Sequence, residues 1–121
     1  MSYEEEQLMM IESVTTFLIS DNIDNLAAVI LDGKEPSQLA DLLEFMGNID
    51  IDLYLTEREA LIRIGLMSKD LWVRHGALRG ASYLDNRNLI DDVRQLIESE
   101  QSNMVKNYAE RILFNWEREI Q

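Results

Sequence analysis

Apolar residues recur every three or four positions along most of the chain, which is the spacing of amphipathic α-helices. The first such stripe contains Leu8, Ile11, Val14 and Leu18. Comparable stripes follow, separated by short polar turns, and together they predict about seven helices. We expect these helices at residues 2–19, 23–31, 36–46, 56–67, 68–84, 89–97 and 102–116. The pattern therefore predicts an all-α fold.

Residues that favour helix ends mark several of these boundaries. Ser2 with Glu5, and Thr56 with Glu59, have the spacing of a capping box. Residues expected to begin or end the other helices are Gly33, Pro36, Gly47, Ser68 and Ser102.

Residues 48–55 fit the helical pattern least well. Apolar and polar residues alternate there, which is typical of a short strand. No second strand is evident to pair with it, and a lone strand edge is unfavourable, so we expect an irregular turn.

Three glycines, Gly65, Gly76 and Gly80, lie inside predicted helices. Each costs about 1 kcal/mol relative to alanine in a helix interior. We expect these positions where a neighbouring helix comes close, because a glycine leaves room for its backbone.

The second half of the chain contains an internal repeat. Residues 70–77 read DLWVRHGA, and residues 102–109, which lie 32 positions later, read SNMVKNYA. In the preceding helix, Leu61 and Ile64 likewise have apolar counterparts 32 positions later, Val93 and Leu96. Two helices per period, each with an apolar face, are typical of stacked helical hairpins.

These residues resemble a HEAT-like repeat over residues 56–116, about half of the chain. The resemblance implies a right-handed stack of helical hairpins, a short α-solenoid. It also implies a non-catalytic scaffold that presents a helix-lined concave surface to other proteins or, in some relatives, to nucleic acid. We expect a single domain over residues 1–121, with residues 1–53 as a divergent cap in which residues 39–46 match the first helix of a pair.

Charge is distributed very unevenly along the sequence. The chain has 23 acidic residues against 11 Lys and Arg, a formal net charge of -12. Residues 1–53 contain twelve of the acids and a single base, Lys34. In the remaining residues the acidic and basic side chains are nearly equal in number. We expect local ion pairs there, such as Asp70 with Arg74. Such an acidic chain repels phosphates, which argues against direct binding of nucleic acid or an anionic membrane.

The acidic half has two interpretations. On the first, its carboxylates serve solubility alone; on the second, they form a docking surface for a basic protein. On the second interpretation the candidate contact residues are Glu12, Asp21, Asp24, Asp41, Glu44, Asp50 and Asp52. Tyr3, Phe45 or Tyr54 would supply apolar anchors.

The leading hypothesis is therefore a non-catalytic protein-binding module with a basic partner. Its most specific form is an inhibitor or immunity protein that neutralises a cationic toxin or nuclease. One alternative is a structural adaptor or oligomer subunit that uses apolar helix faces. A second is a carboxylate-based metal-binding protein.

Few residues suggest catalytic or metal chemistry. The chain has no cysteine, and His75 is its sole histidine, expected at a helix surface or helix–helix boundary. Residues 48–59 resemble an EF-hand calcium loop in their oxygen spacing, but Leu53 replaces the glycine of the sharp turn. We expect no cofactor, resident metal or catalytic residue. Trp72 and Trp116 are expected to be packing residues.

The N-terminus is acidic and no apolar run approaches the length of a membrane span. We therefore expect a cytoplasmic protein.

Overall fold

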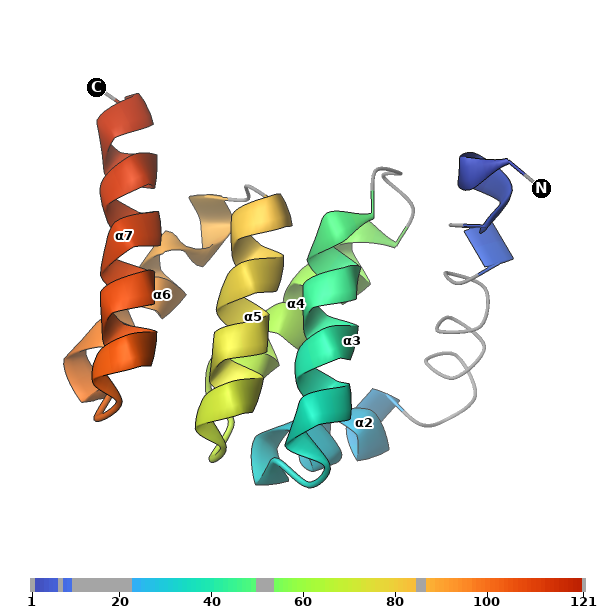
Figure 1. Cartoon of the computed structure of the whole chain (residues 1–121), viewed down its shortest axis with the longest axis horizontal. Coiled ribbons are helices and arrows are strands. Elements are labelled where there is room, and N and C mark those ends of the chain that lie inside the picture. Colours follow the sequence, from blue (N-terminus) through green and yellow to red (C-terminus); the bar gives the residue numbers. More distant parts are fainter. Residues whose placement is uncertain (1, 7, 10–22, 50–53, 85–86, 121) are drawn as a thin grey trace.

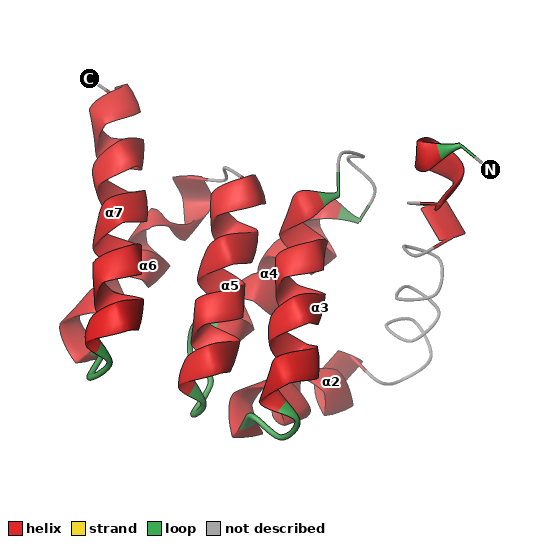
Figure 2. Cartoon of the chain, viewed as in Figure 1, coloured by secondary structure: helices red, strands yellow, loops and turns green. Residues whose placement is uncertain are grey.

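The computed structural model describes residues 2–6, 8–9, 23–49, 54–84 and 87–120. Every regular element within these ranges is helical, which confirms the all-α prediction (Figure 2). The helices are α2 (Ile23–Asp32), α3 (Pro36–Asn48), α4 (Leu55–Gly65), α5 (Leu71–Leu84), α6 (Ile90–Ser99) and α7 (Asn103–Ile120), with a 3-10 turn, η1, at Arg87–Leu89. Residues 3–6 and 8–9 are also helical. Within the described ranges, no helix combines the length and apolar character that crossing a bilayer requires.

The helices form two rows. Helices α3, α5 and α7 lie side by side in what we call the front row, and α2, α4 and α6 lie behind them (Figure 1). The most extensive helix pair is α3 with α5. The prediction that residues 39–46 match the first helix of a pair is wrong, because α3 lies in the same row as α5 and α7, the second helices of the predicted pairs.

The hydrophobic core lies between the two rows. Val73 and Ala77 of α5 and their repeat counterparts Val105 and Ala109 of α7 are all fully buried. Core side chains contributed by the other helices are Leu26, Ile30, Leu39, Leu43, Met46, Leu61, Ile62, Val93 and Leu96. The residues that the sequence pairs at the 32-residue offset are therefore core positions on two neighbouring helices.

Glycines allow α3 and α5 to approach closely, as expected. A Cβ added to Gly76 would lie 2.5 Å from the Ala40 carbonyl oxygen, and one added to Gly80 would overlap the backbone of Leu43. Gly47 faces the backbone of Gly80 in the same way. The prediction that Gly47 ends its helix is wrong, because α3 continues to Asn48 and this glycine serves helix contact instead.

Several predicted caps are confirmed. The hydroxyl of Ser2 accepts the Glu5 backbone N–H at 3.1 Å, and that of Ser102 accepts the Val105 N–H at 3.4 Å. Gly33 follows the end of α2 with a φ of 75°, a conformation that glycine adopts without strain. Pro36 is the first residue of α3.

Two predicted caps are wrong. Helix α5 is capped by Asp70, whose carboxylate accepts the Trp72 and Val73 N–H groups at 2.8 and 3.2 Å, and not by Ser68. Ser68 is buried and donates its hydroxyl to the Ile30 carbonyl at 2.5 Å, so it connects the turn before α5 to α2. The second wrong prediction is the cap at Thr56. Helix α4 begins directly after Tyr54, which has a φ of 55° and makes no side-chain capping hydrogen bond.

Arg74 holds the turns at one end of the rows together. Its guanidinium donates two hydrogen bonds to the Glu100 carboxylate, at 2.7 and 2.8 Å, and one to each of the Ser68 and Lys69 carbonyls at 2.9 Å. The expected pair of Arg74 with Asp70 is therefore wrong, because each is engaged elsewhere. A bidentate, largely buried pair of this kind fixes the position of the turn before α5 against the end of α6.

Candidate functional site

A groove runs between α3 and α5 on the front row. Its volume is about 430 Å³, and its lining residues are Pro36, Ser37, Ala40, Asp41 and Glu44 from α3 and Trp72, His75, Gly76 and Arg79 from α5. Because Gly76 carries no side chain and meets the Ala40 backbone, the two helices touch at this point. The groove therefore has backbone and small residues at the contact between the helices and larger polar and aromatic side chains on either side.

One ion pair crosses the groove. A guanidinium nitrogen of Arg79 on α5 lies 2.9 Å from a Glu44 carboxylate oxygen on α3. The hydroxyl of Tyr83, one turn further along α5, donates to the same Glu44 oxygen at 3.5 Å. The charges of Glu44 and Arg79 therefore largely offset each other.

Asp41 and Trp72 are the two prominent exposed side chains of the groove. Asp41 is exposed on α3, one turn before Glu44, and no base among the described residues forms an ion pair with it. Trp72 lies on α5 and is 52% exposed. A free carboxylate on one wall thus faces the same cavity as an accessible indole on the other.

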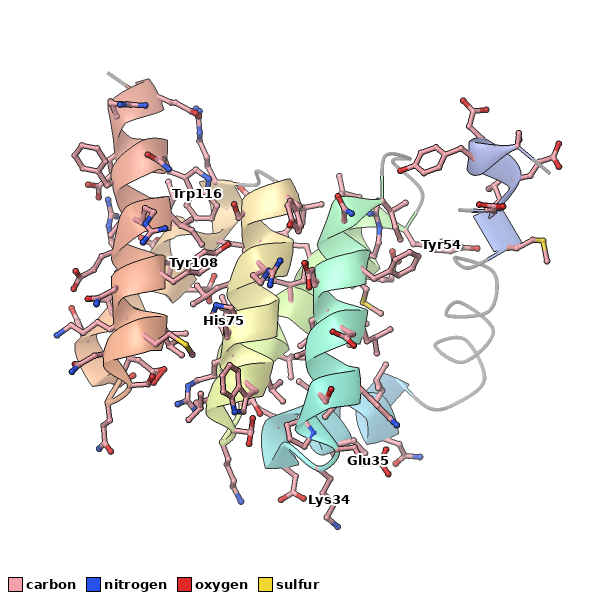
Figure 3. The ribbon with its side chains drawn as sticks, in the orientation of Figure 1. Lys34, Glu35, Tyr54, His75, Tyr108 and Trp116 are labelled. Atoms are coloured by element: carbon pink, nitrogen blue, oxygen red, sulfur yellow. The ribbon has the colours of Figure 1, made fainter. Side chains whose placement is uncertain are left out.

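His75 lies at the boundary between α5 and α7, one of the two locations expected from the sequence. Its ring is edge-on to that of Trp72, at 6.3 Å between centroids, and 5.0 Å from the ring of Tyr108 on α7. Figure 3 shows His75 and Tyr108 between these two helices. Burial and, to a smaller extent, the neighbouring Arg79 lower the pKa of His75 below its ordinary value of 6.5. The neutral form of His75 is therefore favoured at pH 7.

Aromatic and arginine side chains follow one stripe of α5. Trp72, His75, Arg79 and Tyr83 recur every three or four residues, on the side of the helix away from buried Val73, Ala77 and Ala81. Trp, Tyr and Arg are the residue types enriched in the energetic centres of protein interfaces. The prediction that Trp72 packs internally is wrong, whereas Trp116 is 3% exposed and does pack in the core.

The candidate acids predicted from the sequence have different outcomes. Asp41 and Glu44 line the same groove, although Glu44 is engaged by Arg79. Asp24 belongs to α2. The remaining candidates, Glu12, Asp21, Asp50 and Asp52, lie outside the described residues. Of the expected anchors, Tyr3 is exposed, and Phe45 and Tyr54 are half-buried.

The stretch with EF-hand-like oxygen spacing, residues 48–59, is described except for residues 50–53, which include Asp50 and Asp52. At its two ends, Asn48 is the last residue of α3, and Glu59 on α4 forms an ion pair with Arg63 at 2.9 Å. Among the residues that the structure describes, no three acidic or histidine side chains are grouped in a way that would hold a metal ion. The expectation that residues 48–59 hold no resident metal therefore stays a prediction.

The groove offers non-covalent recognition: a carboxylate for a cation, an indole for an apolar or planar group, and backbone at its base. No protein-family model, curated protein or solved structure matches the chain.

Proposed function

We propose that this chain is a non-catalytic protein-binding scaffold of HEAT-like helical hairpins, and that its α3–α5 groove docks a basic segment of another protein. The observation that carries the binding part is the groove itself, where exposed Asp41 and exposed Trp72 line one cavity from two helices.

The repeated core and cap positions support the scaffold part. Asp70 and Ser102 each accept a backbone N–H from the residue three positions later, Val73 and Val105, at the start of neighbouring helices in the front row. The same two valines are fully buried in the core between the front row and the helices behind it. Stacked hairpins bury such faces mutually and leave the outer face of the row for binding.

Electrostatics supports a basic partner. The net charge of -12 attracts cationic proteins from a distance and accelerates their association at low salt. Near the groove, Asp41 provides the carboxylate that is not offset by an internal pair. The narrower hypothesis, neutralisation of a cationic toxin or nuclease, rests on size and charge and stays a prediction.

A charge-reversal comparison tests the proposal. Partners are captured from a lysate of the source organism, identified, purified and titrated by calorimetry against the wild-type chain, Asp41→Lys and Glu98→Lys. Glu98 is a suitable control because it is exposed on α6, in the other row, and the charge change is identical. We expect Asp41→Lys to weaken binding about tenfold or more and Glu98→Lys less than about threefold. Equal effects of the two variants, or affinity insensitive to salt, would contradict the proposal.

The oligomer-subunit alternative has one observation in its favour. Phe114 on α7, the last helix of the front row, is 62% exposed, and the Arg118 guanidinium lies 5.9 Å from its ring centroid. A second copy covering this helix would bury the ring. Light scattering that shows self-association, unweakened by salt and abolished by Phe114→Gln, would favour this alternative over the groove.

A further inference from the structure

We propose that the α3–α5 groove selects arginine over lysine: a guanidinium of an extended segment of the partner protein lies between the Asp41 carboxylate and the Trp72 indole. This inference rests on the proposed function and specifies which chemical group the groove recognises.

The charges around the groove favour a cationic group. Arg79 is already paired with Glu44, at 2.9 Å, so it does not compete with an incoming cation for the Asp41 carboxylate. Burial disfavours the charged form of His75, so this ring adds little positive charge to the groove. Asp41 therefore gives the groove an excess of one negative charge, and it is exposed to an incoming side chain.

The opposite wall discriminates between cations. The Trp72 ring is 52% exposed, and its edge-to-face contact with His75, at 6.3 Å between centroids and 82° between planes, limits its orientations. A planar guanidinium stacks on an indole face and donates two parallel hydrogen bonds to a carboxylate. An ammonium is compact and strongly hydrated, and it cannot make the bidentate contact.

The shape of the groove suits an extended chain. Its volume of about 430 Å³ matches a small ligand or one long side chain with adjoining backbone. The close contact of Gly76 with the Ala40 backbone removes side chains from the base, so a flat group can lie near main-chain atoms.

Matched peptides test this inference. Three capped peptides of alternating glycine and a variable residue carry arginine, lysine or citrulline, which has the shape of arginine without its charge. Each is titrated by calorimetry against the wild-type chain, Asp41→Asn, Trp72→Ala and the control Glu98→Gln. Fluorescence of a Trp116→Phe variant, in which Trp72 is the remaining tryptophan, reports whether the peptide reaches the groove.

We expect the arginine peptide to bind about fivefold or more tightly than the lysine peptide, and the citrulline peptide not to bind measurably. Asp41→Asn should weaken arginine binding about fivefold and Glu98→Gln less than twofold, whereas Trp72→Ala should reduce the arginine preference to below twofold. Equal affinity for arginine and lysine, with Asp41→Asn still weakening both, would overturn the arginine preference and leave the proposed function standing. Peptide binding that Asp41→Asn and Glu98→Gln weaken equally, or no binding at all, would overturn the inference and the groove as docking site together.

Discussion

Replacement of Arg74 by methionine should destabilise the chain far more than the same replacement of Arg94. The Arg74 and Glu100 side chains are 18% and 1% exposed, whereas Arg94 and its partner Glu117 are 49% and 46% exposed. Both arginines form a short ion pair, at 2.7 and 2.8 Å, so the two substitutions remove pairs of similar length from a buried and an exposed setting.

The magnitude follows from what each substitution leaves behind. Arg74→Met strands a buried carboxylate and removes the hydrogen bonds to the Ser68 and Lys69 carbonyls. Loss of one partner of a buried pair costs about 4 kcal/mol of unfolding free energy. Arg94→Met removes a solvent-exposed pair, which solvent screens, so its cost in unfolding free energy should be far smaller. For a chain of this length, the corresponding fall in melting temperature is about 15 °C for Arg74→Met.

Urea unfolding followed by circular dichroism measures both variants. The double variant Arg74→Met/Glu100→Gln removes the stranded charge, so we expect it to recover about half of the loss, with the missing carbonyl hydrogen bonds accounting for the remainder. If Arg74→Met and Arg94→Met lowered the unfolding free energy equally, the assignment of Arg74 to the junction of α5 and α6 would be refuted.

Three further predictions concern the packing, the caps and the histidine. Gly76→Ala should lower the unfolding free energy by about 1–2 kcal/mol in urea titrations, despite alanine's better helix propensity, because the new Cβ meets the Ala40 backbone; an unchanged midpoint would contradict the close contact. Asp70→Ala should cost about 1 kcal/mol and Thr56→Ala less than half of that in the same assay, since Asp70 caps α5 whereas Thr56 is not the cap of α4; equal losses would contradict the cap assignment. His75 faces Arg79, Glu44 and Tyr108 and has a lowered pKa, so its contribution to stability is full above pH 6.5 and is lost as the pH falls through the lower folded pKa. The fall in melting temperature between pH 7.5 and 5 should therefore be smaller in His75→Gln than in the wild type, and an identical fall would refute this.

Sequence periodicity was sufficient to predict α2 to α7 and part of the core, while most of the helix predicted at residues 2–19 lies outside the described residues. The recurrence of Val73 and Val105 at a fixed offset identified equivalent buried positions, because burial requires the same residue types at the same helical register. Helix boundaries were less reliable. Ser68 and Asp70 are both good caps by residue type, and only the buried hydrogen bond of Ser68 to Ile30 shows why the second is used.

The candidate groove depends on packing between helices, which periodicity along one helix does not report. Glu44 appeared as one acid among many, and its pairing with Arg79 arises from the contact of α3 with α5. The predicted packing role of Trp72 is wrong because membership of a repeat helix does not report which face of that helix a residue occupies. The signal that would have placed it outside is its register, since it falls on the same stripe as Arg79 and opposite Val73 and Ala77.

Amide chemical-shift mapping with the arginine peptide tests the docking claim most directly, because the chain has two tryptophans with contrasting environments. Trp72 is 52% exposed in the groove and Trp116 is 3% exposed in the core. We predict that the peptide shifts the indole N–H signal of Trp72 and the backbone signals of α3 around Asp41, and leaves the indole signal of Trp116 unmoved. Shifts confined to α6 and α7, with the Trp72 signal unchanged, would contradict the claim that this groove receives the partner.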